Sequence, residues 1–325
     1  MPGRAAVANL DGVPNPCASD PAAAPGDEPV NVHDQPGLPE DPEELRAHAQ
    51  ALRLLQEGGY NPMVGGAYAL RVHTGLWRDT KDLDLFLRRD QVDAALALLD
   101  GAGYRVELTD PLWIAKAFSG EYFIDLIFSS GNGIAVVDEE WARRSITAPV
   151  LGLKALVVPP EEIIWSKAFV QERERFDGAD IHHLIRCKGE QIDWRYLLDR
   201  FAPHWHVLFS HLVMFRFAFP GERRAIPSWV MNDLASRVPA EELEVPPGEA
   251  ARLCRGSLLS RQQYLHEMNE LGFADARERE VPGWRGDIRW PVHGRDAGPA
   301  GAGRHAGDEG ERHEEGEDDA NRSRG

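Results

Sequence analysis

The 325-residue chain lacks any apolar run of eighteen residues, so we expect no membrane-spanning helix. It has three cysteines, Cys17, Cys187 and Cys254, and their wide spacing fits neither a metal motif nor a disulfide framework. Its first residues lack the apolar core of a signal peptide and are interrupted by Pro14 and Pro16. These absences favour a cytoplasmic protein without disulfides or structural metal.

Three common catalytic motifs are also missing. The chain has no His-Glu-x-x-His, no Gly-x-x-x-x-Gly-Lys and no Gly-x-Ser-x-Gly. Zinc proteases, P-loop nucleotidases and serine hydrolases that depend on these motifs therefore have no support.

The charge balance is strongly acidic, with a net charge of −17. This argues against broad DNA binding, which needs a basic surface to displace counterions from phosphates. It still permits a local basic pocket for one triphosphate. Carboxylates that hold a divalent metal would add to the acidic balance.

The composition divides the chain into four parts. Residues 1–40 and 290–325 have few large apolar side chains, so we expect a disordered N-terminal segment and a disordered acidic tail. Residues 41–158 alternate between strand-like and helix-like patterns, whereas 159–289 is mostly helical. The predicted fold class is α+β, with a mixed sheet flanked by helices and then a mostly helical C-terminal half.

Each half yields a series of expected elements. Before Pro159 we expect helices and strands in residues 41–59, 60–73, 82–89, 90–103, 104–109, 112–119 and 122–130. After it we expect helices in residues 159–176, 176–189, 193–201, 204–219, 228–238 and 257–273.

Two aspartates of the strand DLDLF point the same way. Residues two apart in a strand share a face, so Asp82 and Asp84 converge while the leucines between them face the core. Like-charged carboxylates resist joint ionisation unless a divalent cation lies between them. Oxygen ligands of this kind suit Mg²⁺.

A third carboxylate, Asp125, lies in the otherwise apolar strand YFIDLIF. A buried charge is costly unless it is paired or binds metal. If this strand neighbours DLDLF, the three aspartates form a cage for one or two Mg²⁺ ions, which activate a hydroxyl and stabilise leaving pyrophosphate.

Two glycines, Gly65 and Gly66, fall between a strand and a helix. Glycine lets backbone N–H groups approach a ligand closely, and a helix N-terminus favours phosphate oxygens. The turn is therefore a candidate cradle for phosphates whose metals Asp82 and Asp84 hold. Each feature alone also has a structural explanation: a simple turn, a solvent-facing strand, or a strand-end aspartate with a backbone partner.

The strings VGGAYAL, KDLDLF and YFIDLIF together resemble the nucleotidyltransferase superfamily typified by DNA polymerase β. That family's signature is Gly-Gly or Gly-Ser, then Asp-x-Asp on the next strand, then a third Asp on a later strand. The stretch GGAYALRVHTGLWRDTKDLDLF is similar to small bacterial members, which include antibiotic nucleotidyltransferases and abortive-infection toxins. Arg78, Thr80, Asp82 and Asp84 match their pattern residue by residue.

A second region, SKAFVQERERFDGADIHHLI, resembles the toxin-like members more loosely. The resemblance implies that Lys167 reaches nucleotide phosphates and that Asp177 and Asp180 form an acidic pair in the nucleotide site. The alternative is a solvated charged helix in which Arg173 and Arg175 pair with nearby glutamates.

The resemblance implies an Mg²⁺-dependent nucleotidyltransferase that moves a nucleoside monophosphate from an NTP, such as ATP, to an acceptor hydroxyl. The acceptor would be a small molecule, with tRNA or protein as the alternative for a toxin-type enzyme. An inactive nucleotide-binding scaffold is the non-enzyme alternative. The implied roles are metal binding by Asp82, Asp84 and Asp125, proton removal by Asp125, phosphate binding by Gly65, Gly66, Arg78 and Lys167, and loop support by Thr80.

Overall fold

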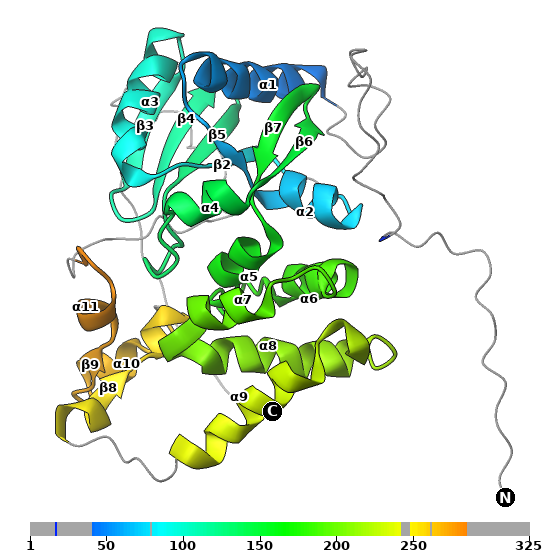
Figure 1. Ribbon diagram of the computed structural model, residues 1–325. Coiled ribbons are helices and arrows are strands. Elements are labelled where there is room, and N and C mark those ends of the chain that lie inside the picture. Colours follow the sequence, from blue (N-terminus) through cyan, green and yellow to red (C-terminus); the bar gives the residue numbers. More distant parts are fainter. Residues whose placement is uncertain (1–16, 18–40, 79, 242–247, 261, 285–325) are drawn as a thin grey trace, which may run out of the picture. The chain divides into compact units, whose positions relative to one another are not determined.

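The computed structural model describes Cys17 and residues 41–78, 80–241, 248–260 and 262–284 (Figure 1). The expectations of disorder for 1–40 and 290–325 therefore lie outside the described residues, except at Cys17. None of the described helices has both the length and the apolar character needed to cross a membrane.

Seven strands in the described part of the chain form one mixed sheet in the order β3-β4-β5-β2-β1-β7-β6 (Figure 1). The central strand β2 runs parallel to β5 and antiparallel to β1, and β1 runs parallel to β7. The strand bounds are β1 Met63–Val64, β2 Asp82–Phe86, β3 Arg105–Asp110, β4 Ile114–Ser119, β5 Tyr122–Ile127, β6 Ile146–Val150 and β7 Leu153–Val157.

The helices of the α/β half are α1 Pro42–Glu57, α2 Gly66–Thr74, α3 Arg89–Gly101 and α4 Glu139–Arg144. Helix α1 begins where the sequence predicts, because the Asp41 side chain accepts a hydrogen bond from the Glu43 N–H at 2.8 Å and Pro42 occupies the first turn. Its buried face includes Leu52 and Leu55, and it packs on α3 and β5. Helix α2 instead packs on α6.

Alternation in the two central strands sets the position of the acidic residues. Leu83 and Leu85 of β2 are fully buried in the core, so Asp82 and Asp84 face the opposite side. In β5 the neighbours of Asp125, Ile124 and Leu126, are likewise fully buried. The aspartates of both strands therefore lie on one face of the sheet.

Two strands, β6 and β7, were not anticipated by the sequence. They form a hairpin whose turn residues, Leu151 and Gly152, both have positive φ, at 53° and 72°. A leucine rarely adopts this conformation, so the usual Asn-Gly or Asp-Gly turn signal is missing. Pro149 in β6 also obscures the strand pattern, although proline is tolerated at a sheet edge.

The second half is mostly helical, as expected. Its bounds are α5 Pro160–Ala168, α6 Gly178–Lys188, α7 Trp194–Phe201, α8 Trp205–Ala218, α9 Ser228–Glu241, α10 Leu265–Asn269 and α11 Arg277–Glu280, with short strands β8 Leu253–Cys254 and β9 Ala274–Asp275.

Two predicted helices of this half are wrong in extent. The helix expected over 159–176 ends at Ala168, and the charged segment that follows turns back through a bridge between Gln171 and Phe176. This segment has few apolar residues to bury as a helix face. The helix expected over 257–273 is reduced to the five-residue α10 and one 3₁₀ turn.

The expectation that the cysteines form no disulfide is also wrong. Cys17 is bonded to Cys187 of α6, 170 residues later in the chain, whereas Cys254 is a buried thiol. Spacing rules detect local cysteine motifs, and they do not anticipate a pair that only the fold brings together.

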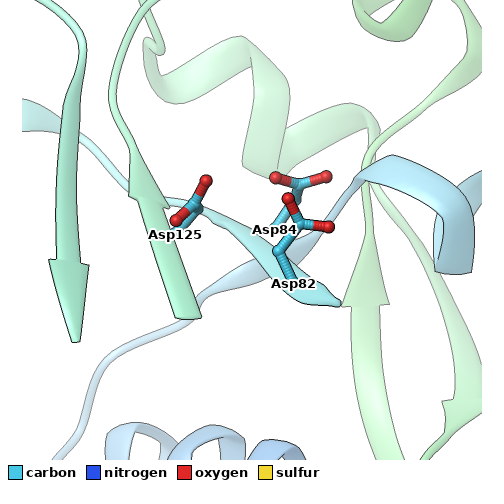
Figure 2. Close-up of side chains that lie close together, drawn as sticks. All are labelled: Asp82, Asp84 and Asp125. Atoms are coloured by element: carbon cyan, nitrogen blue, oxygen red, sulfur yellow. The ribbon is translucent and has the colours of Figure 1, made fainter. Parts of the chain in front are cut away.

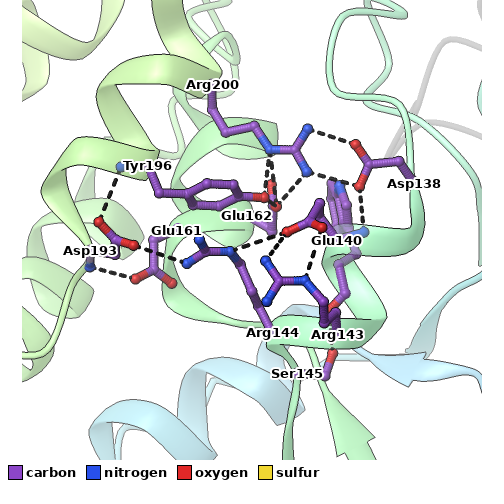
Figure 3. A network of polar contacts seen from close by, with 11 residues as sticks. Asp138, Glu140, Arg143, Arg144, Ser145, Glu161, Glu162, Asp193, Tyr196 and Arg200 are labelled. Carbon is purple, nitrogen blue, oxygen red and sulfur yellow. Dashed lines mark hydrogen bonds and ion pairs between the residues drawn. The ribbon is translucent and has the colours of Figure 1, made fainter.

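A polar network centred on Arg200 connects α4, α5 and α7 (Figure 3). Its guanidinium donates two hydrogen bonds to Asp138, the N-cap of α4, at 2.7 and 2.9 Å, and another to Glu162 of α5 at 2.8 Å. The Tyr196 hydroxyl also donates to Glu162, which is fully buried. Burial raises the pKa of Glu162, while Tyr196 and Arg200 oppose that shift.

We predict that Arg200→Met destabilises the protein by about 3–5 kcal/mol, because it leaves the buried Glu162 carboxylate without its cation. The control Arg143→Met removes an exposed pair with Glu140 three residues away and should cost less than about 1 kcal/mol. Urea unfolding measures both. Equal losses for the two variants would show that the network contributes no more than a surface pair.

Candidate active site

The three predicted carboxylates form one cluster (Figure 2). Asp84 of β2 and Asp125 of β5 are directly paired in the parallel register, and Asp82 lies two residues before Asp84 on the same face. One oxygen from each carboxylate lies within 4.8 Å of the others. Asp125 thus lies on the strand next to that of Asp82 and Asp84 and on the same face of the sheet.

The environment of the cluster disfavours negative charge in the absence of a cation. Withdrawal from water raises the pKa of Asp84 to about 8, and the charges of Asp82 and Asp125 add to the shift. Burial raises the pKa of Asp125 to about 6, although the neighbouring Lys116 opposes this. The crowded carboxylates therefore favour either protons or a divalent cation.

The donor set fits a divalent metal ion. Carboxylate oxygens are hard ligands of the type that Mg²⁺, Mn²⁺ and Ca²⁺ prefer, and no thiolate or imidazole joins this cluster among the described residues. A second observation supports a shaped site: a Cβ atom built on Gly66 would lie 1.8 Å from Oδ2 of Asp84. The backbone of the glycine turn thus comes directly against one carboxylate.

The two glycines have distinct structural reasons. The Gly65 N–H donates to the Asp84 carbonyl at 2.9 Å, and a side chain at Gly65 would collide with the ring of Phe86. Gly66 has φ +53° and begins α2. The contact of the two glycines with phosphates stays a prediction. The structure places the N-terminus of α2 next to the carboxylates.

Thr80 and Arg78, on the segment before β2, are both held by carboxylates. The Thr80 hydroxyl donates to Oδ1 of Asp82. Arg78 donates to Oδ2 of Asp180 at 2.6 Å, and its side chain remains 58% exposed. Thr80 thus contacts the cluster itself, whereas Arg78 links the segment before β2 to helix α6.

Lys167, Asp177 and Asp180 form a second group beside the cluster. The Lys167 ammonium lies 2.8 Å from Asp177 and 3.0 Å from Asp180, which is buried. Burial alone would lower the pKa of Lys167, but the two carboxylates raise it. The alternative of one solvated charged helix is wrong, because residues 169–177 are not helical and these three side chains are largely buried, although Arg173 does pair with Glu174.

Electrostatic interactions connect the second group to the first. The charges of Lys167 and Arg175 both lower the pKa of Asp84, against the larger effect of burial. Arg175 also binds Asp177, at 3.2 Å. Cations from the helical half therefore act on the metal-binding candidates of the sheet.

Sequence reasoning missed one residue that touches the cluster, Lys116 of β4. Its ammonium donates to Oδ1 of Asp125 at 2.6 Å. The available signal was a single charged residue within the apolar strand Ile114–Ser119, one strand before Asp125.

A family match agrees with this geometry. Residues 44–200 match a family described as "Nucleotidyl transferase of unknown function (DUF2204)". The matched region includes all three aspartates and Lys167, and it confirms the predicted resemblance to nucleotidyltransferases at the level of superfamily and enzyme class.

The solved structures that match the chain share little sequence with it. The antibiotic-resistance factor ANT(2'')-Ia is 17% identical, with 53% of this chain and 97% of that chain covered and a TM-score of 0.39. The lincosamide antibiotic adenylyltransferase LnuA is 17% identical, with coverages of 45% and 98% and a TM-score of 0.33. An antigenic nucleotidyltransferase-like protein from Paracoccidioides brasiliensis is 17% identical, with coverages of 57% and 94% and a TM-score of 0.36. A comparison with curated protein sequences finds no match.

We predict that Gly66→Ala disrupts the cluster, because the new methyl group displaces the Asp84 carboxylate. Mn²⁺ binding, measured by electron paramagnetic resonance, should weaken by about 10-fold or more. The control Gly59→Ala also places alanine at positive φ, but no atom lies within 4 Å of its Cβ position. Both variants should lose about 1–2 kcal/mol of stability from the backbone conformation. Unchanged Mn²⁺ affinity in the Gly66 variant would contradict the proposed fit.

A second prediction concerns the pH dependence of the metal-free protein. The pKa of Asp84 rises from 3.8 to about 8 on folding, so its protonated form stabilises the fold and that contribution is lost as pH rises toward 8. Urea unfolding in EDTA should show wild type losing stability relative to Asp84→Asn between pH 5 and pH 9. Mg²⁺ at pH 9 should restore the wild type more than the variant. Parallel pH curves would show that Asp84 is not held in such an environment.

Proposed function

We propose that this chain, whose residues 44–200 match a nucleotidyl transferase family, catalyses Mg²⁺-dependent transfer of a nucleoside monophosphate from an NTP to an acceptor hydroxyl. The observation that carries the proposal is the cluster of Asp82, Asp84 and Asp125 beside the N-terminus of α2. An inactive scaffold has no need to keep three crowded carboxylates, which are costly without a cation.

The reaction is a substitution at the α-phosphorus. The acceptor oxygen forms a new bond to this phosphorus, the bond to the β-phosphate bridging oxygen breaks, and pyrophosphate leaves with the electron pair. Bound Mg²⁺ would lower the charge on the phosphates and favour the attacking alkoxide. Asp82 and Asp84 would hold the ion, and Asp125 would contribute a third ligand and accept the hydroxyl proton.

Lys167 is suited to bind a phosphate without leaving its two aspartate partners. An ammonium has three donors, and the two contacts with Asp177 and Asp180 leave one donor for a phosphate oxygen. In this proposal Asp177 and Asp180 belong to the nucleotide site because they hold Lys167. Arg78 shares Asp180 and has an exposed guanidinium with further donors.

The N-terminus of α2 is the proposed phosphate cradle. The first N–H groups of a helix lack partners within the helix and favour anions. Gly65 and Gly66 keep this turn free of side chains next to Asp84. One nucleotide can therefore contact the glycine turn through its phosphates and the carboxylates through its metal.

The acceptor we propose is a small molecule, and ATP is the nucleotide we would test first. A net charge of −17 disfavours tRNA. We propose residues 41–158 as the catalytic domain and 159–289 as the helical domain that contributes Lys167. The use of an NTP favours the cytoplasm, and the Cys17–Cys187 disulfide is the feature that favours an oxidising compartment instead.

We predict that Asp82→Asn, Asp84→Asn and Asp125→Asn each reduce nucleotide transfer by at least about 10²-fold, because each removes a charge that stabilises the metal-bound transition state. Arg78→Met should lose about 10-fold or less, since other cations remain near the phosphates. Each labelled NTP is incubated with Mg²⁺ and a cell extract, and the labelled product is identified by mass spectrometry.

The matched control is Asp93→Asn, which changes an exposed aspartate of α3 outside the cluster and should leave transfer unchanged. Full activity in the Asp84 variant would overturn the assignment. If tRNA or a protein becomes labelled, the acceptor is a macromolecule of the kind that a toxin-type enzyme modifies, and the small-molecule proposal is wrong. Nucleotide binding without any labelled product would favour the scaffold alternative.

A further inference from the structure

Three side chains form a row across neighbouring strands of the sheet. Lys116 of β4 pairs in register with Asp125 of β5, and Asp125 pairs in register with Asp84 of β2. Neighbouring strands lie about 4.8 Å apart, so residues in register face one another directly. Asp125 therefore lies between a cation on one side and the carboxylates of β2 on the other.

Lys116 is fixed in this row by more than one contact. Its side chain is only 13% exposed, and its ammonium lies 2.6 Å from Oδ1 of Asp125. The ammonium also lies 4.5 Å from the centre of the Phe123 ring, two residues before Asp125 on the same face of β5. Because both contacts are on β5, the lysine is directed at one oxygen of Asp125.

We propose that Lys116 is a positioning residue for the reaction: it holds Oδ1 of Asp125 so that the other oxygen serves the metal and the acceptor hydroxyl. This inference rests on the proposed function. Without the lysine, both oxygens of the Asp125 carboxylate would be free to turn toward the cation. The carboxylate would then no longer offer an oxygen to the acceptor proton.

The lysine also sets the charge of the cluster. Three ionised carboxylates and one ammonium carry a net charge of minus two, which one divalent cation balances. The negative charge of a bound triphosphate would accommodate a further divalent ion. Removal of Lys116 leaves an unbalanced charge, so the cluster should bind a metal ion more tightly and turn over more slowly.

A purely structural role for the ion pair makes a different prediction. Loss of one partner of a buried pair destabilises a protein because the other charge stays buried. Such a variant would be less stable, and a smaller fraction of the protein would be folded and active. Its kcat per folded site and its metal affinity would both stay unchanged.

The test compares Lys116→Met, Lys116→Arg and wild type by two independent readouts. Mn²⁺ titration without nucleotide, followed by electron paramagnetic resonance, should show binding tightened by about 10-fold in Lys116→Met, because a nearby positive charge has been removed. Steady-state kinetics should show kcat lowered by about 10- to 100-fold with the NTP KM changed by less than about 3-fold. Lys116→Arg should restore the wild-type Mn²⁺ affinity and part of kcat.

The matched control is Lys154→Met, which removes an exposed lysine of β7 and should change neither readout. If wild type is active, an unchanged kcat in Lys116→Met would overturn the role of Lys116 but not the proposed function. Mn²⁺ binding that is unchanged or weaker in this variant would do the same. A wild type that binds Mn²⁺ but transfers no nucleotide would overturn the proposed function, and the catalytic role of Lys116 with it.

Discussion

The central constraint on this protein is the crowding of like charges at one face of its sheet. Asp82, Asp84 and Asp125 lie close enough to share one ion, and burial holds the pKa of two of them above the usual range. Such an arrangement is unfavourable unless positive charge compensates it. The neighbouring features are arranged around this need: the glycine turn approaches Asp84, Lys116 binds Asp125, and Lys167 acts on Asp84 from the helical half.

The two halves of the chain make different contributions to the site. The sheet supplies the carboxylates through a fixed register, so their spacing follows from strand pairing and does not depend on mobile loops. The helical half supplies Lys167, whose position depends on Asp177 and Asp180. Arg78 then connects the segment before β2 to Asp180, which makes the acidic cluster and the cationic group parts of one network.

The sequence predicted the parts that depend on local pattern. Alternation located β2 and β5, an unusual charge in an apolar strand singled out Asp125, and the Gly-Gly pair marked the turn before α2. Lys116 lies in a strand that the sequence also predicted, but its ion-pair partner, Asp125, became evident only from the order of the strands in the sheet. The β6–β7 hairpin was missed because its turn uses Leu151, and the end of α5 was missed because the charged residues after Ala168 have few apolar side chains to bury as a helix face.

The most direct test of the account is a crystal structure with Mn²⁺ and a non-hydrolysable NTP analogue, in which anomalous scattering locates the metal. We expect an Mn²⁺ peak bound by Asp82, Asp84 and Asp125, with the triphosphate against Gly65–Gly66 and in contact with Lys167. A nucleotide bound elsewhere, or bound here with its metal away from all three carboxylates, would contradict the account.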